Sequence, residues 1–569
     1  NRKCTDVLCL LLMVAAWGAM TIIGLIVTGV ISNPNLEPGV PARLINGIDY
    51  QNRICGVDSG VKNLTVLYYL PSGDGVCIED CPSQYNYTKF YCVESVMPTV
   101  YDSSTGTYDV VEGWAAVANG TCMYEIETID ILNYCVPKEA IDAADTAAGA
   151  GYTADLITAR CYVFGFGIGV AGAAGFLFLI LLRIPGVVCL LVWGCMVAIW
   201  ALFALGGVVL QQTSEKWSSA DEPHQYSESQ INGVLYLAYV MYGLCGLWTL
   251  LALWLRKRIN LAVGITKEAA RAVSAMKLLI LYPVIQTTGL LIFLVPWTIY
   301  CIYLASSGTI TATTVAGISV KQFEYDDNIR YAGLYLLFCY FWTSEFIVAI
   351  GQIVVAMATA TWYFTRDKGA IGNGTVLKAI RHSMWYHSGT AAFGALVIAI
   401  IKTIRAVVAY FQKKAANTHN KVLEMMLCCL QCCLWCLEKC MKFLNKNAYI
   451  QTAIFGYSFC KACRKAFFLI LRNILRVAAV AGVSELVLLL GKIGIPLATS
   501  FMFYVCVNYA KGDDMHGLIG PTITVAILSF FVAKMFTEVF GMAISTILQC
   551  FIADEEMFEP ADRFGEGGL

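Results

Sequence analysis

Long apolar stretches recur along this chain, and they constrain its fold more than any other feature. The first runs from Val7 to Ile31 without a charged side chain. Eight more lie near residues 160–182, 186–210, 231–255, 278–305, 330–363, 389–411, 478–508 and 517–551. Because about 20 apolar residues in a helix cross the roughly 30 Å hydrocarbon core of a bilayer, the sequence predicts an all-α polytopic membrane protein with nine clear transmembrane helices.

Composition agrees with this class. Of the 569 residues, 58% are hydrophobic and only 14% are charged, which is too few charges for a set of soluble domains. The first stretch exceeds the apolar core of about 7–15 residues in a cleaved signal peptide, so we expect it to be retained as a helix. Since the sequence begins at Asn1 rather than Met, we also expect a cytosolic segment upstream of it.

Motifs of soluble enzymes are missing from the sequence. It contains no G-x-x-x-x-G-K-[ST] phosphate loop, no H-E-x-x-H zinc motif and no G-x-S-x-G nucleophile elbow. The formal net charge of −1 provides no global field that would recruit nucleic acid. We therefore expect neither an enzyme, an ATP-driven pump nor a nucleic-acid-binding protein, and we expect no cofactor or metal.

The charges between the apolar stretches alternate in sign. Lys and Arg concentrate at 256–271 and 366–381, whereas Asp and Glu dominate at 215–228, 324–327 and 513–514. Lys and Arg are enriched in cytosolic loops of membrane proteins. The basic loops are therefore predicted to be cytosolic, together with both termini, residues 1–6 and the acidic tail 552–569.

Residues 32–158 form the longest polar segment and are predicted to be an extracellular domain. This segment contains six cysteines, Cys55, Cys77, Cys81, Cys92, Cys122 and Cys135, and three N-x-Ser/Thr sequons, Asn63, Asn86 and Asn119. An even number of cysteines in a small domain is typical of an oxidising compartment, where disulfides compensate for a marginal core. We expect three disulfides, whose pairing the sequence leaves open, and N-glycosylation at the sequons.

A cysteine-rich stretch at about 422–443 supplies a tenth transmembrane helix if it crosses the membrane. Its thiols are Cys428, Cys429, Cys432, Cys433, Cys436 and Cys440. Their spacing resembles paired C-x-x-C metal ligands, but four of them recur every four residues, as small apolar residues packed on one helix face do. This pattern favours buried thiols over palmitoylation, and both over a metal site.

The path of residues 412–476 is open. Lys413, Lys414 and Lys421 would lie outside the cell if 389–411 crosses fully, against the charge rule, so a re-entrant helix is the alternative to a crossing one. Basic and aromatic residues mix at 439–476, which is typical of an amphipathic segment at the inner leaflet. We expect residues 412–476 to contain the cysteine-rich transmembrane or re-entrant helix followed by this amphipathic segment. Transmembrane helices 2 to 7 are expected within 159–411, and helices 9 and 10 within 477–551.

Glu345 is the leading candidate site residue, because an ionisable side chain inside a transmembrane helix usually persists for a functional reason. Its helix face also carries Phe338, Phe341, Trp342, Ala349 and Gln352. A quaternary ammonium has no N–H to donate, so an anion among aromatic rings is the chemistry that recognises it. The candidate binding residues are Glu345, Trp342, Tyr340, Phe341, Gln352, Trp297 and Tyr300.

A structural role for these residues is the alternative. The rings would then fill helix packing or anchor span ends at the membrane interface, and Glu345 would form a hydrogen bond to the end of a neighbouring helix. Two further carboxylates each have a lysine on the same helix: Glu485 lies seven residues before Lys492, and Glu538 lies four residues after Lys534. These are candidates for structural ion pairs or for proton sites.

Two segments near the C-terminus carry a distinctive pattern: C-C-L-W-C-L-E-K-C-M-K-F-L-N-K-N-A-Y-I-Q-T-A-I-F-G (432–456) and F-C-K-A-C-R-K-A-F-F-L-I-L-R-N (459–473). The start of the chain adds Arg2-Lys3-Cys4-Thr5-Asp6, Asp49-Tyr50 and Cys55-Gly56, and W-Y-F ends the sixth stretch at 362–364. Over effectively the whole chain, these features resemble the choline transporter-like family, solute carrier family 44.

The resemblance implies ten spanning helices, cytosolic termini and a choline carrier that works by alternating access at the plasma membrane. A mitochondrial location, ethanolamine as a second substrate and proton exchange are further expectations from it. Choline and membrane lipid are the implied partners, and we favour a monomer. The alternatives from other classes are a cell-surface receptor or adhesion protein, and a passive channel or lipid-handling protein.

Overall fold

A computed structural model describes residues 4–93, 122–139, 158–184, 186–218, 227–315, 318–417, 420–511 and 517–559, with short pieces at 101–102, 107–108, 117, 120, 155–156, 515 and 562–565. The chain forms two compact units, and each is described by itself. Unit 1 comprises Asn1–Leu11, Leu156–Thr288 and Ser344–Leu569, and unit 2 comprises Leu12–Asp155 and Gly289–Thr343.

Nine helical segments in the described residues are long and apolar enough to cross a membrane. They are α1 (Val7–Val27), the run α6 (Arg160–Phe164), η1 (Gly165–Val170) and α7 (Ala171–Arg183), α8 (Val187–Ser218), α9 (Glu228–Ala275), α10 (Lys277–Ser306), α11 (Asp327–Tyr363), α13 (Ser388–Asn417), α16 (Ile474–Lys511) and α17 (Ile519–Met557). Each coincides with one predicted stretch, which confirms the fold class.

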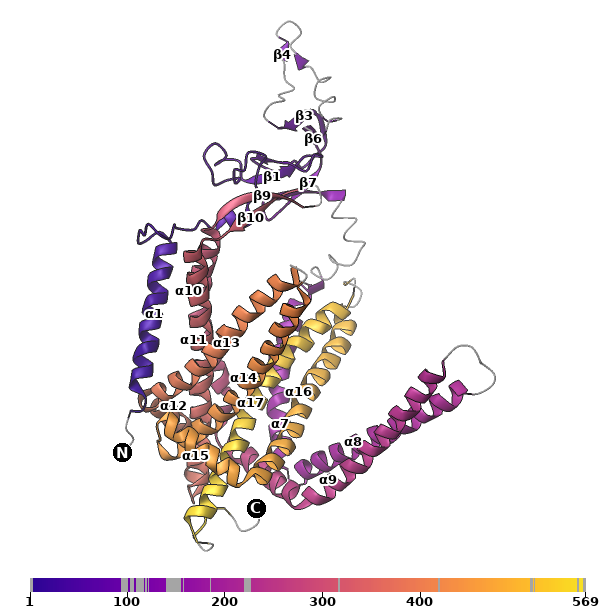
Figure 1. Ribbon diagram of the computed structural model, residues 1–569, viewed down its shortest axis with the longest axis vertical. Helices are drawn as coiled ribbons and strands as arrows, with labels where there is room; N and C mark the ends of the chain where they lie inside the picture. Colours follow the sequence, from indigo (N-terminus) through magenta and orange to yellow (C-terminus); the bar gives the residue numbers. More distant parts are fainter. Residues whose placement is uncertain are drawn as a thin grey trace. The chain divides into compact units, whose positions relative to one another are not determined.

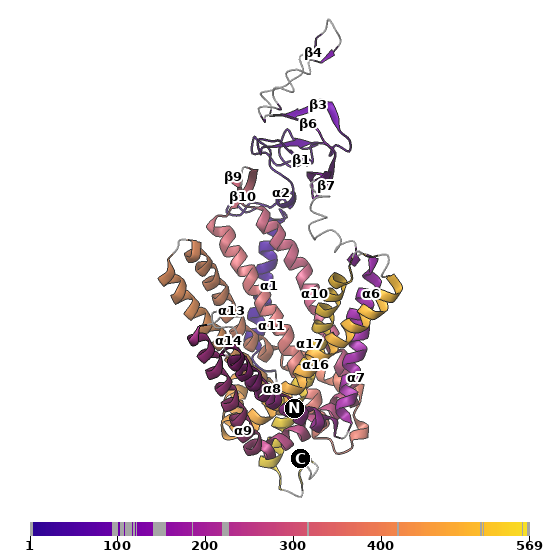
Figure 2. The ribbon, with the colours of Figure 1, turned by 90° about the vertical axis from the view of Figure 1, so that its right-hand side faces the viewer.

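Within unit 1, the spanning helices pack as neighbours in sequence. α8 pairs with α9, and α16 pairs with α17 (Figures 1 and 2). α9 begins with a capping box, in which Ser227 Oγ accepts from the backbone N–H of Gln230 while the Gln230 side chain accepts from the backbone N–H of Ser227. Within α11, every side chain from Ile353 to Ala360 is buried. This part of α11 is therefore core rather than lipid-facing surface.

The cysteine-rich stretch lies on α14 (Lys421–Phe455), one continuous helix of 35 residues that packs against α13 (Figure 1). At 1.5 Å per residue it extends about 50 Å, which is long enough to cross a bilayer. A tenth crossing stays a prediction. Its six thiols are exposed on the surface of the protein. The expectation that they pack against a neighbouring helix is wrong, because the other face of α14 contacts α13.

Unit 2 contains strands that the sequence did not predict. One sheet has the order β2-β1-β8-β7, from β1 (Val66–Tyr69), β2 (Gly75–Ile78), β7 (Thr128–Ile131) and β8 (Tyr134–Pro137), with β1 and β8 parallel. The remaining pairs are β3 (Asn86–Cys92) with β6 (Cys122–Glu125), β4 (Tyr101–Asp102) with β5 (Thr107–Tyr108), and β9 (Thr309–Val315) with β10 (Ile318–Glu324). A short helix, α2 (Ala42–Ile45), precedes the sheet.

Three disulfides hold this β-rich region together, as predicted. They join Cys55 to Cys77, Cys81 to Cys135 and Cys92 to Cys122. All six cysteines of the segment are therefore paired. The small core between the bonds is built around Tyr68, whose hydroxyl donates to the backbone oxygen of Tyr124 at 2.9 Å.

Candidate functional site

Glu345 of α11 forms an ion pair with Lys402 of α13, with Oε1 and Nζ 2.5 Å apart. The same oxygen lies 3.5 Å from Nζ of Lys442 on α14. The Glu345 side chain is only 11% exposed, and an enclosed carboxylate requires an opposite charge to stay ionised. Glu345 is therefore held between cations from two other helices.

Lys442 links this pair to a second carboxylate. Its Nζ lies 2.8 Å from Oε1 of Glu438, one turn earlier on α14. Arg405 of α13 donates to the other carboxylate oxygen of Glu438. We call these five residues the charge network; with three cations and two carboxylates, it carries an excess of one positive charge.

Close packing of α13 on α14 sets the geometry of the charge network. The Asn445 side-chain amide of α14 donates to the backbone oxygen of Gly394 on α13 at 2.8 Å. A Cβ at Gly394 would overlap the hydroxyl of Tyr449, so the two helices approach this closely only because residue 394 is glycine. Small residues have this role in membrane helix pairs generally. The lysines of α13 and α14 are thereby brought to the same carboxylate.

Aromatic residues gather on α10 and α11 within unit 2. The rings of Trp297 and Tyr340 have centroids 5.0 Å apart, and those of Phe338 and Trp342 are 5.5 Å apart. Tyr340 also contacts Phe341, at 5.6 Å. We call these five residues the aromatic cluster. The indole N–H of Trp297 donates to the backbone oxygen of Leu336 at 2.9 Å, so the polar group of this ring is already paired within unit 2.

The predicted binding residues are divided between the two units. Trp297, Tyr300, Tyr340, Phe341 and Trp342 belong to unit 2, and Glu345 and Gln352 belong to unit 1. The Tyr300 ring rests against Gly24 of α1, where a Cβ would overlap it. Packing against α1 is thus a role that the structure gives Tyr300.

The two other predicted ion pairs are present on their helices. Nζ of Lys492 lies 3.0 Å from Oε1 of Glu485 on α16, and Nζ of Lys534 lies 3.8 Å from Oε1 of Glu538 on α17. Glu485 is 67% exposed and Glu538 is 63% exposed. Both carboxylates are much more exposed than those of the charge network, and neither pair shares a residue with that network.

Sequence reasoning missed four members of the charge network: Lys402, Arg405, Glu438 and Lys442. A signal was available for the first two, because both lie inside the apolar stretch 389–411, where any ionisable residue is a candidate. Glu438 and Lys442 lie four apart on the cysteine-rich stretch, a spacing at which opposite charges meet on a helix. Spacing within one helix does not indicate which carboxylate on another helix each cation contacts.

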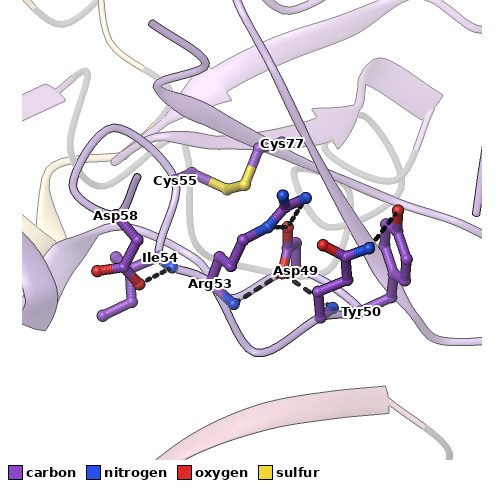
Figure 3. A network of polar contacts seen from close by, with 8 residues as sticks. Asp49, Tyr50, Arg53, Ile54, Cys55, Asp58 and Cys77 are labelled. Carbon is purple, nitrogen blue, oxygen red and sulfur yellow. Dashed lines mark hydrogen bonds and ion pairs between the residues drawn. A yellow bond between two sulfur atoms is a disulfide. The ribbon is translucent and has the colours of Figure 1, made fainter. Parts of the chain in front are cut away.

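Asp49, part of the motif noted near the start of unit 2, organises a tight turn (Figure 3). Its Oδ1 accepts from the backbone N–H groups of Gln51 and Arg53 at 2.9 and 2.7 Å, and its Oδ2 accepts from the Arg53 guanidinium at 2.8 Å. Asp58 accepts from the backbone N–H of Ile54 at 2.7 Å, beside the disulfide of Cys55. These contacts give the motif a structural role.

The remaining sequence candidates are placed as follows. Asn63 is exposed and Asn86 is half-buried on β3, while Asn119 lies outside the described residues. In the part of the chain that the structure describes, no group of three or more His, Cys, Asp or Glu side chains is arranged to hold a metal ion. Glycosylation stays a prediction.

This arrangement defines a class: a polytopic helical membrane protein in which packed helices enclose mutually paired charged side chains. The family described as plasma-membrane choline transporter matches residues 239–556, which include the whole charge network and the aromatic cluster. The chain belongs to this family.

Relatives cover nearly the whole chain. Choline transporter-like protein 2 of Dictyostelium discoideum is 28% identical over 98% of this chain and 92% of its own length. Choline transporter-like protein 2 of Bos taurus is 26% identical with the same coverage. Choline transporter-like protein 1 of Caenorhabditis elegans is 26% identical over 98% of this chain and 85% of its own length.

Proposed function

We propose that this protein is a plasma-membrane transporter of choline that works by alternating access. Family membership and the names of the relatives support choline as substrate. The observation that carries the proposal is the enclosed carboxylate of Glu345, paired with Lys402 at 2.5 Å. A permanently charged solute needs an anion inside the membrane, and a carboxylate already paired with a displaceable ammonium supplies one.

In this mechanism the trimethylammonium group of choline replaces the Lys402 ammonium beside Glu345. The charge network already has excess positive charge, so a further cation is repelled unless one lysine gives up its proton. Lys402 releases that proton to water as choline binds, and choline and the proton move in opposite directions across the membrane. Lys442, which is near both carboxylates, keeps Glu438 paired meanwhile.

Four rings of the aromatic cluster, Phe338, Tyr340, Phe341 and Trp342, precede Glu345 in the sequence of α11. A ring face attracts a quaternary ammonium by about 0.5–2 kcal/mol. Ethanolamine carries N–H donors and pairs with Glu345 directly, but its smaller ammonium gains less from the rings. We propose that it is a second, weaker substrate, and that the protein serves mitochondrial as well as plasma membranes.

Uptake of radiolabelled choline into proteoliposomes of the purified protein tests this function. Saturable uptake is the result expected of a carrier. A receptor or adhesion protein would give no uptake, and a channel would give flux that does not saturate. Lipid handling would appear as movement of labelled phospholipid instead of choline.

Two lysine variants test the coupling step. K402M removes the exchangeable proton, so choline uptake should lose its dependence on an imposed pH gradient. K492M is the matched control, because Lys492 is also paired with a carboxylate on a spanning helix but lies outside the charge network. Equal pH dependence in wild type and K402M would rule out Lys402 as the exchanged site.

A further inference from the structure

Two short helices outside the nine candidate spans, α12 (Asn373–Tyr386) and α15 (Phe459–Arg472), share one surface pattern. On α15 the buried face consists of Phe459, Ala462, Ala466 and Leu469. At about 100° per residue, two exposed sectors follow around the helix. One is apolar, with Phe467 and Leu471, and the other is mainly basic, with Lys461, Arg464 and Lys465 around the exposed ring of Phe468.

The same order of sectors occurs on α12. Its buried face consists of Val376, Ala379 and Ser383. Leu377 and Met384 form the exposed apolar sector, and Lys378 and Arg381 lie beside it with Trp385, which is 73% exposed. An exposed tryptophan between basic residues is typical of a helix at the membrane–water interface.

The N-terminal segment places these helices together in unit 1. The backbone N–H of Thr5 donates to the backbone oxygen of Tyr386, the last residue of α12, at 3.0 Å. Asp6 Oδ2 accepts from Thr390 Oγ1 at the start of α13 and from the backbone N–H of Phe459 at the start of α15, both at 2.7 Å. The end of α12 and the start of α15 therefore meet at the same end of α13 (Figure 1).

The cations of the two exposed sectors are Lys378, Arg381, Lys461, Arg464 and Lys465; we call them the basic surface. No carboxylate among the described residues forms an ion pair with any of them. Two nearby cations, in contrast, have carboxylate partners within the chain: Arg472 pairs with Glu556 at 3.2 Å, and Arg476 pairs with Glu555 at 2.5 Å. The basic surface thus retains its charge for a partner outside the chain.

We propose that the basic surface binds the headgroups of anionic phospholipids, with the apolar sectors of α12 and α15 against the acyl chains. Lysine and arginine form charge-assisted hydrogen bonds to phosphate oxygens. The adjacent exposed apolar side chains distinguish a lipid from a free phosphate or an acidic peptide, because only the lipid supplies a hydrocarbon layer beside the charge. The predicted cytosolic position agrees, since anionic lipids are concentrated in that leaflet.

The test uses the full chain in nanodiscs of phosphatidylcholine with or without phosphatidylserine. Native mass spectrometry measures how much phosphatidylserine stays bound after detergent extraction. Each basic residue near an anionic surface strengthens binding by on the order of fivefold. The K461Q/R464Q/K465Q and K378Q/R381Q variants should therefore bind phosphatidylserine on the order of tenfold or more weakly than wild type. Thermal unfolding in phosphatidylcholine alone establishes that each variant is folded.

Matched variants make the result specific. K413Q/K421Q removes two exposed lysines, one near the opposite end of α13 and one at the start of α14, and should change retention less than about twofold. The charge-preserving K461R/R464K/K465R should also change retention less than about twofold. Equal losses from K413Q/K421Q and K378Q/R381Q would overturn the proposal, since any surface lysine would then suffice. Displacement of the lipid by inorganic phosphate, or by an acidic peptide, would also overturn it. Choline uptake is not the readout, so the outcome is independent of the proposed transport.

Discussion

Lys402 and Glu345 lie on different spanning helices, and their charged atoms are 2.5 Å apart. This contact joins α11 to α13, and Lys442 extends it to α14. When a charged pair is enclosed in this way, removal of one partner lowers the stability of the folded protein far more than replacement of both partners together.

Removal of only the Glu345 carboxylate should destabilise the protein strongly. E345A removes the carboxylate that Lys402 pairs with and leaves the charge network with one carboxylate for three cations, at an expected cost of about 3–5 kcal/mol. E345L/K402M removes the pair as a unit and should cost much less. Thermal unfolding in a neutral detergent measures both. D327N/R330Q is the control, because this pair on α11 is 77% and 63% exposed and should contribute at most about 1 kcal/mol. Equal effects of E345A and D327N/R330Q would contradict an enclosed network.

Gly394 should tolerate no larger side chain. G394A places a Cβ where the Tyr449 hydroxyl lies, so α13 and α14 must separate, and we expect a loss of about 1–3 kcal/mol in stability. G243A in α9 is the matched control, since nothing lies within 4 Å of a Cβ there. It should raise stability by up to about 1 kcal/mol through helix propensity. Choline uptake by G394A, compared with G243A, reports whether the charge network depends on this packing.

The disulfides should differ in their contributions to the stability of the β-rich region of unit 2. Cys81–Cys135 closes a loop of 54 residues, and Cys55–Cys77 closes one of 22. In the chain-entropy description the longer loop contributes about 1 kcal/mol more. C81S/C135S should therefore lower the unfolding temperature of the β-rich region more than C55S/C77S does. Limited proteolysis of the full chain measures this, with a reversed order as the contradicting result.

The pairing of β3 with β6 should weaken in acid. Burial raises the pKa of Glu125, but hydrogen bonds from Lys89 at 2.6 Å and Tyr91 at 2.8 Å outweigh burial, so the pKa lies below the usual value of 4.5. A depressed carboxylate pKa stabilises the folded state above pH 4.5 and loses that contribution as pH falls through the folded pKa. Hydrogen exchange of β3 and β6 should accelerate below about pH 4.5, and E125Q should remove that dependence. Identical pH profiles for wild type and E125Q would exclude Glu125 as the cause.

Local patterns in the sequence were enough to predict the nine apolar spans, the six paired cysteines and the family, because hydropathy and cysteine number act without reference to distant residues. Glu345 could also be identified as a candidate site residue, since an ionisable residue inside an apolar span is unusual whatever its partner is. The strands of unit 2 were not predicted, because they are short and depend on partners far away in sequence.

The pairing of distant groups was decided only by the tertiary structure. Lys402 and Lys442 meet Glu345 because three helices have particular rotations about their axes, and Gly394 permits the approach. The exposure of the α14 thiols has the same origin, because the rotation of α14 against α13 decides which face is covered. Spacing within one helix specifies which residues share a face, whereas packing between helices specifies what that face contacts.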